Sequence, residues 1–387
     1  MRAHLKRLVL SNWRNFKKVD APLGARTFVV GPNASGKTNL LDAVRFLRDI
    51  ASPGGSLVRA VNDRRGMKHI RSLHAGSRSN VIVTVEVSID GDQNTWKYTL
   101  ELSGSEGTKK PFRIEKEEVF HGDTEVLRRP KPDETDERLL TQTHLEQISQ
   151  SLKFRPLADA LASVVHVHIV PQVSRTPARA EEFSRRDAPG SDFIDQLAKL
   201  SERDKNRTLR RIEKLLKIAV PRFSQLKIER DKLGRPHLEA NYEHWRRRGG
   251  WQNEQEFSDG TLRLIGLLWA IDYGKAPLLL EEPELSLHSD VIRQLPRMLA
   301  QAAQRTGRQI VVSTHAEEML SDRGIDPSEI WLLEPTENET KVVVGSERSV
   351  LTNAAKAKIP LGRIVTGLTK PQNIEQLSLP GAMGLKK

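Results

Sequence analysis

The sequence contains no cysteine. This absence excludes disulfide bonds, thiolate zinc sites, iron–sulfur ligation and a cysteine nucleophile, and it suits a reducing compartment. The sequence also lacks any charge-free apolar stretch of membrane-spanning length, and its N-terminal apolar run is soon broken by Ser11, Asn12 and Arg14. We therefore expect no membrane-spanning helix, no signal peptide and a cytoplasmic location. Internal repeats and long heptad runs are lacking as well.

Positive charge, by contrast, is abundant and unevenly distributed. Lysine and arginine number 62 against 50 aspartates and glutamates, a formal net charge of +12. Fifteen cationic residues against seven acids fall within 201–250, and seven against two fall within 346–387. Because clustered positive charge attracts anionic polymers, 201–250 is a candidate nucleic-acid contact.

Hydrophobic periodicity predicts an α/β fold. Apolar runs at 5–10 and 27–30 predict strands, and a helical spacing of leucines follows from Thr38. Short runs between 81 and 127, separated by turns, predict an antiparallel β insertion. Helical spacing with dense charge over 193–220 predicts a basic helical lobe.

The expected organisation has four parts. They are the N-terminal part of a head (1–172), the basic helical lobe (173–256), the C-terminal part of the head (257–345) and a basic tail (346–387).

The most specific motif is a complete phosphate-loop pattern between a predicted strand and a predicted helix. Its glycines let backbone N–H groups point at phosphate oxygens, and the helix N-terminus adds positive potential. Lys37 would bind the β and γ phosphates of ATP, and Thr38 would ligate Mg²⁺. The alternative is an ordinary glycine turn before a helix. The residues assigned to the nucleotide are Gly31, Asn33, Ala34, Ser35, Gly36, Lys37, Thr38 and Asn39.

A second motif is an apolar run that ends in carboxylates, over 277–284. Such a run is typical of a buried parallel strand whose tip faces a ligand crevice. Glu281 would then hold Mg²⁺ and Glu282 would polarise the attacking water. The alternative is an acidic helix N-terminus.

Two further motifs stand at predicted element boundaries. His315 ends another apolar run, where it could donate to the γ phosphate, although a lone histidine is often structural. Residues 257–261 precede an apolar helix, for which Ser258 is also a good N-cap.

Together these motifs resemble those of the ABC-type ATPases of the RecF, SMC and OLD (overcoming lysogenisation defect) group. The resemblance implies the P-loop NTPase fold of an ABC ATPase head, with 31–38 as Walker A, 257–261 as the signature motif, 278–282 as Walker B, 284–288 as the D-loop and His315 as the switch histidine. It is closest to OLD-type ATPases, whose signature reads Ser-Asp-Gly-Thr. It further implies that Arg14 touches the nucleotide, and that Gln172 is the Q-loop residue at the nucleotide and metal.

Three positions depart from the pattern of that group. Glu281 stands where relatives outside this branch have Asp, Phe257 replaces Leu, and Ser289 replaces Pro. None of the three removes a phosphate or metal ligand, so they bear on subfamily placement more than on ATP binding.

The resemblance implies an ATPase that forms a homodimer on ATP binding. Each ATP would be held by Walker A of one protomer and capped by Ser258 and Gly260 of the other. It also suggests antiphage defence. After the last expected strand only Glu347 and Glu375 are acidic, too few for a metal-dependent nuclease, so cleavage would need a separate effector nuclease.

Other readings are a RecF-like DNA repair clamp and the energising subunit of a membrane transporter; the basic stretch argues against the transporter. Residues 242–251 mix arginines with aromatics, which suits a nucleic-acid backbone with stacked bases but also an exposed loop. His166 and His168 share a strand face and form a weak metal candidate.

Overall fold

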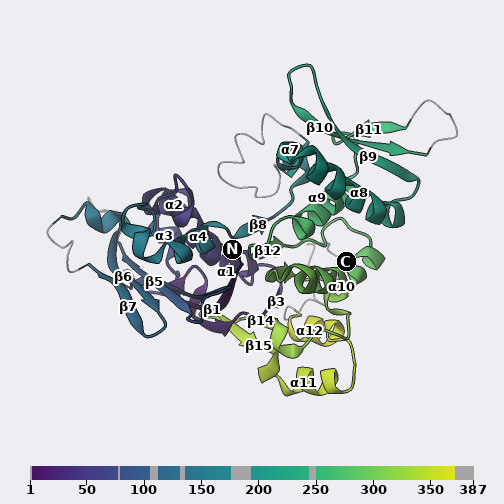
Figure 1. The fold of residues 1–387 in the computed structure, drawn as a ribbon. Helices are drawn as coiled ribbons and strands as arrows, with labels where there is room; N and C mark the ends of the chain where they lie inside the picture. The colour runs from purple at the N-terminus through teal and green to yellow at the C-terminus, as the bar shows by residue number, and fades with distance from the viewer. Residues whose placement is uncertain are drawn as a thin grey trace, which may run out of the picture.

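The computed structural model describes residues 2–76, 79–104, 112–130, 136–175, 193–243 and 250–370. Within these residues the strands form three sheets, which we call the N-terminal, central and lobe sheets. Figure 1 shows the N-terminal sheet on one side, the lobe sheet on the other, and the central strands between them.

The central sheet is six-stranded in the order β15-β14-β3-β13-β12-β8, and only the β14–β15 pair is antiparallel. Both faces are buried, since Leu278 and Leu280 enter one core cluster while Leu279 between them enters the other. A parallel sheet with two covered faces needs such continuous apolar runs. The strands are β3 (Arg26–Val30), β8 (Val165–Val167), β12 (Leu278–Glu281), β13 (Ile310–Thr314), β14 (Ile330–Pro335) and β15 (Thr340–Val344).

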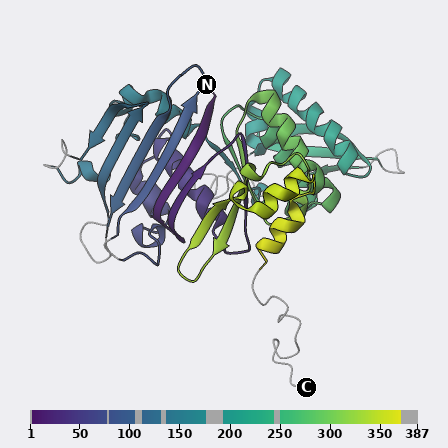
Figure 2. The ribbon, with the colours of Figure 1, turned by 90° about the horizontal axis from the view of Figure 1, so that it is seen from below.

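The N-terminal sheet is antiparallel in the order β2-β1-β4-β5-β6-β7. The predicted meander over 81–127 is confirmed as β4 to β7. These inserted strands extend the hairpin of β1 and β2, because β1 pairs directly with β4. Figure 2 shows these strands as one continuous sheet. The strands are β1 (Ala3–Trp13), β2 (Phe16–Pro22), β4 (Val81–Ile89), β5 (Trp96–Ser103), β6 (Arg113–His121) and β7 (Thr124–Arg129).

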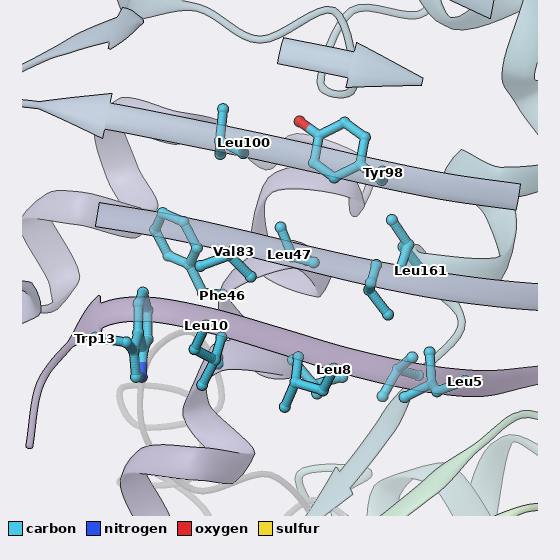
Figure 3. Close-up of a cluster of buried hydrophobic side chains, with 14 of the residues drawn as sticks. Leu5, Leu8, Leu10, Trp13, Phe46, Leu47, Val83, Tyr98, Leu100 and Leu161 are labelled. Carbon is cyan, nitrogen blue, oxygen red and sulfur yellow. The ribbon is translucent and has the colours of Figure 1, made fainter. Parts of the chain in front are cut away.

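Helix α1 (Lys37–Ala51) lies between the N-terminal and central sheets. Its apolar residues Phe46 and Leu47 pack with Leu8 and Leu10 of β1, and Figure 3 shows these side chains gathered in one cluster. The helix starts at the phosphate-loop motif, so this core fixes the direction in which the loop faces. Three short helices pack into the same core cluster as α1: α2 (Leu57–Asp63), α3 (Met67–Ile70) and α4 (Arg155–Ala162).

The opposite face of the central sheet is covered by helices α9 (Asp259–Asp272) and α10 (Ser289–Thr306). Helix α9 is apolar almost all round, as expected for a helix buried between layers. Beyond it lie α7 (Phe193–Lys199) and α8 (Glu202–Ala219), which confirm the amphipathic helices predicted over 193–220.

The lobe is not wholly helical as predicted, because residues after α8 form the antiparallel lobe sheet β11-β10-β9. Leu226, Leu238 and Ala240 of this sheet are buried in the same cluster as the apolar face of α8. A short run with alternating apolar residues forms a strand when a neighbouring helix covers its apolar face. The strands are β9 (Phe223–Arg230), β10 (Pro236–Tyr242) and β11 (Trp251–Asn253).

The predicted basic tail is folded over much of its length. Helices α11 (Ser349–Lys356) and α12 (Gly362–Leu368) pack on the head through Leu351 and Val365, both fully buried. Residues 371–387 lie outside the described residues. Among the helices that are described, none is long and apolar enough to cross a bilayer.

A buried ion-pair cluster ties the β1–β2 turn to α1 and α2. The Asp42 carboxylate on α1 accepts hydrogen bonds from Arg64 Nη2 at 2.7 Å and from Arg14 Nη2 at 2.6 Å. Burial raises the pKa of Asp42, but the Arg64 charge and hydrogen bonds outweigh it, and the pKa falls to about 2. The Asp42 carboxylate therefore stays ionised and bound to its arginines at pH values somewhat below its ordinary pKa of about 4.

We expect the pair of Asp42 and Arg64 to stabilise the fold fully above pH 4. The stabilisation, about 2 kcal/mol, should be lost as pH falls from 4 through 2, because the folded state must then protonate Asp42. Asp42→Asn should cost about 3 kcal/mol at pH 7, since it leaves the buried Arg64 with Asp49 as its one remaining acidic partner among the described residues and removes the acidic partner of Arg14. Urea unfolding from pH 2 to 7 measures both.

The exposed pair Arg7–Asp20 provides the control, with Asp20→Asn expected to cost less than about 1 kcal/mol. An Asp42→Asn protein as stable as the parent at pH 7 would contradict the prediction.

Candidate functional site

The phosphate loop leaves the buried strand β3 at Gly31 and enters α1 at Lys37. Two residues adopt a positive φ, Ala34 at 63° and Gly36 at 99°. A Cβ at Gly36 would also collide with the Asn15 side chain, so this position requires glycine for two reasons. The loop therefore curls as the motif predicted.

Lys37 is almost fully buried and folds back over the loop. Its ammonium Nζ donates to the carbonyls of Gly31 at 3.0 Å and Pro32 at 3.2 Å. Ser35 beneath it is fully buried, and its hydroxyl has no partner within the described residues. A lysine held across a concave loop, next to an unpaired hydroxyl, fits a bound phosphate group.

Asn15 clamps this loop to the rest of the head. Its Nδ2 donates to the Ser35 carbonyl and to Thr340 Oγ1, each at 2.8 Å, and its Oδ1 accepts from Asn39 Nδ2 at 2.8 Å. Sequence reasoning missed this role, although Asn15 stands next to Arg14 in the same motif. Asn39 is one of the residues expected at the nucleotide, but in this structure its side-chain amide donates to Asn15.

Arg14, the other residue expected at the nucleotide, points elsewhere in this structure. Its guanidinium binds Asp42 on the side of α1, in the cluster described above. The local backbone is left-handed, with φ of 51° at Arg14.

The acidic tip of β12 meets the loop. Glu281 Oε1 accepts a hydrogen bond from Thr38 Oγ1, and Glu281 Oε2 lies 3.2 Å from His166 Nε2. Burial raises the pKa of Glu281, but the hydrogen bonds from His166 and Thr38 outweigh this and lower it overall. The carboxylate is therefore ionised at neutral pH.

Glu282, the next residue, turns out of the strand with a left-handed φ of 41°. Its Oε1 lies 3.7 Å from Lys37 Nζ and 3.3 Å from His315 Nδ1. The hydrogen bond with His315 lowers the pKa of Glu282 against the effect of burial, and Lys37 lowers it further. The same bond raises the pKa of His315. The phosphate loop, the acidic tip of β12 and His315 therefore lie together at one edge of the central sheet.

Glu284 fixes the backbone at His315 through hydrogen bonds. It is 4% exposed and accepts from Thr314 Oγ1 at 2.6 Å and from the His315 backbone N–H at 3.2 Å. Burial raises the pKa of this carboxyl. The sequence placed Glu284 only at the start of the D-loop.

The donors at the edge of the sheet suit magnesium. A hydroxyl and a carboxylate are hard oxygen ligands, and Mg²⁺ is commonly held by one or two such groups together with phosphates and water. The described ranges contain no cluster of three or more His, Cys, Asp or Glu able to hold a metal by themselves. Thr38 and Glu281 would therefore share the ion with a nucleotide.

The signature motif lies at the N-terminus of α9. Ser258 is exposed and caps the helix, accepting from the Thr261 N–H at 3.1 Å. Gly260 approaches the carbonyl of Ser286 in the D-loop so closely that a Cβ would not fit. Arg175 fixes the turn by donating to the Phe257 carbonyl at 2.6 Å.

Two predicted elements are only partly described. Gln172 lies in the four-residue helix α5 (Pro171–Ser174), and its side chain is outside the described residues. The strand before it, β8, ends at Val167, so His168 lies just beyond the strand. Of the stretch 242–251, residues 244–249 lie outside the described residues.

Similar proteins were found at the level of sequence and of fold. The DNA replication and repair proteins RecF of Brucella abortus and Brucella suis are 44% identical over 63 residues, which is 16% of this chain and 15% of theirs. The chain thus spans only a small part of those relatives. The SMC head bound to the C-winged helix domain of ScpA shares the fold, with a TM-score of 0.50, 15% identity, and 88% of this chain and 97% of that one covered.

A family model described as "AAA domain, putative AbiEii toxin, Type IV TA system" matches residues 26–321, which include the phosphate loop, the acidic tip, the signature motif and His315. With three quarters of its length matched and its P-loop strands in the arrangement of an SMC head, the chain belongs to this family of AAA domains.

Proposed function

We propose that this protein binds ATP with Mg²⁺ and hydrolyses it. The observation that carries the proposal is the meeting of Lys37 and Thr38 with Glu281 and Glu282 at one edge of the central sheet. An ordinary glycine turn would not place a buried lysine 3.7 Å from a carboxylate that follows a different strand.

Each residue has a part that its contacts support. Lys37 would exchange the loop carbonyls for the β and γ phosphates, and Thr38 and Glu281 would hold magnesium, which neutralises phosphate charge. Glu282, kept ionised by His315 and Lys37, would accept a proton from the attacking water. His315 uses Nδ1 to donate to Glu282, and its raised pKa favours the protonated ring, in which Nε2 also carries a proton and would donate to the γ phosphate.

Glu282→Gln should retain ATP binding but reduce turnover about 10²- to 10⁴-fold, because the general base is lost. The ATP-bound protein should then elute from gel filtration as a dimer. Glu347→Gln, an exposed position on the head, is the control. Turnover at the parental rate would remove Glu282 from this role.

We further propose that two protomers share each ATP. The exposed N-terminus of α9 carries Ser258 and Gly260, and a helix N-terminus supplies positive potential suited to a γ phosphate. In this arrangement the Walker A loop of one chain would face the signature motif of the other.

Mixing two inactive variants tests this shared site. Lys37→Ala and Ser258→Arg should each lose ATPase activity alone, and an equimolar mixture should recover about a quarter of the parental rate, because half of the dimers carry one intact composite site. ATPase assays of the single variants and the mixture measure this. If the Ser258→Arg protein binds ATP yet the mixture stays inactive, the shared site is wrong.

The nucleic-acid proposal rests on one face of α8. Five cations recur there at intervals of three and four residues, opposite the buried Leu209, Ile212 and Leu216, so they form a single exposed stripe: Arg203, Arg207, Arg210, Lys214 and Lys217. Arg207 and Lys217 pair with acids on the same helix. Trp251, 44% exposed, lies nearby with Lys227 Nζ 4.4 Å above its ring. We propose that this stripe contacts the DNA backbone.

A double charge reversal, Arg203→Glu with Arg210→Glu, should weaken DNA binding at least tenfold and lower the slope of log affinity against log salt by about one per lost phosphate contact. Fluorescence anisotropy with double-stranded, single-stranded and gapped DNA, and with RNA, measures this. Arg323→Glu, exposed on the head, is the control. Unchanged affinity and salt slope would exclude the stripe on α8 as a DNA contact.

The biological setting is proposed on resemblance. The OLD-like motifs and a family description that names a toxin support an antiphage defence role, with a separate effector nuclease as partner. The segment shared with RecF favours a second candidate, a DNA repair clamp. An ATPase assay with the same DNA substrates separates the two candidates, because a particular DNA structure would stimulate the ATPase of a clamp without any partner protein.

A further inference from the structure

His166 is a buried imidazole next to the magnesium carboxylate. It lies on β8, the edge strand of the central sheet, and is only 4% exposed. In the parallel pairing of β8 with β12, His166 is in register with Leu279, two residues before Glu281. Residues two apart on a strand share a face, so His166 and Glu281 lie on the same face, which also receives α1 and its Thr38.

The contact between them is direct and directional. His166 Nε2 lies 3.2 Å from Glu281 Oε2, and a carboxylate oxygen at this site can only accept. The proton is therefore on Nε2 whether the ring is neutral or charged. The other oxygen of the same carboxylate accepts from Thr38, so each oxygen has its own donor.

The two hydrogen-bond donors to Glu281 differ in whether they have a second role at the site. Thr38 is itself assigned to magnesium, so its hydrogen bond to Glu281 competes with that task. His166 has no such second task, because Nε2 faces Glu281 and the buried Nδ1 has no partner within the described residues. A glutamate also has one more rotatable bond than an aspartate, and it needs a restraint if its carboxylate is to stay at one place.

We propose that His166 is a positioning residue that fixes the carboxylate of Glu281 toward Thr38 and the phosphate loop. The inference rests on the proposed ATP and magnesium site and adds a residue to it. Packing alone does not account for the imidazole, since an apolar side chain would fill the same buried space without leaving Nδ1 unpaired.

The earlier reading of His166 with His168 as a metal pair is not supported by the contacts. His166 directs Nε2 at a carboxylate, and the described residues provide no group of three ligands around it. His168 makes no hydrogen bond to Glu281, and it therefore serves as a matched control.

The test measures metal binding without turnover. Mn²⁺ is titrated into the protein with a non-hydrolysable ATP analogue, and free Mn²⁺ is followed by electron paramagnetic resonance. His166→Leu should weaken Mn²⁺ binding about 10- to 100-fold, as for other residues that orient a metal ligand. Nucleotide affinity in EDTA should stay unchanged. His166→Gln, whose amide nitrogen can replace Nε2, should restore Mn²⁺ affinity to within about threefold of the parent.

His168→Leu should behave as the parent. If His166→Leu does not fold, as judged by its melting temperature, His166→Asn takes its place, because its shorter amide cannot reach Glu281. Parental Mn²⁺ affinity in the Leu or Asn variant, or failure of Gln to restore it, would overturn the inference. A parent protein that binds neither nucleotide nor Mn²⁺ would instead overturn the proposed function.

Discussion

The structure depends on three parallel strands, β3, β13 and β12, that end at the same edge of the central sheet. Parallel strands bring their carboxyl ends together, so the residues after each strand must share one crevice. Here those residues are a lysine, a threonine, a histidine and two glutamates, and each of them contacts another of the set. Lys37 lies against Glu282, Glu282 against His315, and Glu281 against Thr38.

Packing on both faces keeps this edge rigid. On one side α1 is wedged against the N-terminal sheet, and Asn15 and the Asp42 cluster attach the β1–β2 turn to it. On the other side α9 is buried along nearly its whole length while its N-terminal Ser258 stays exposed. The loop, the acidic tip and the signature motif are therefore all carried by elements with buried partners, which suits a site that must hold its donors before the ligand arrives.

Charge is divided between two regions with different environments. At the sheet edge, charges are close, partly buried and mutually neutralising, which shifts the pKa of Glu282 downward and that of His315 upward. On the stripe of α8 they are exposed, and Arg203, Arg210 and Lys214 form no ion pair with an acid of the described part of the chain. The first arrangement suits chemistry on a bound phosphate, and the second suits weak, salt-dependent contact with an extended polyanion.

The sequence by itself determined the local elements: the loop at 31–38, the strand before Glu281, the strands between 81 and 127 and the helices over 193–219. Their signals are periodicity and glycine placement, which act within a few residues. Only the tertiary structure decided that β1 joins β4, that 223–253 forms a sheet, that 349–368 packs on the head, and that Arg14 binds Asp42. It also brought His166 to Glu281 across 115 residues. Such pairings depend on which surfaces remain uncovered after the rest of the chain has packed, and no local pattern encodes that.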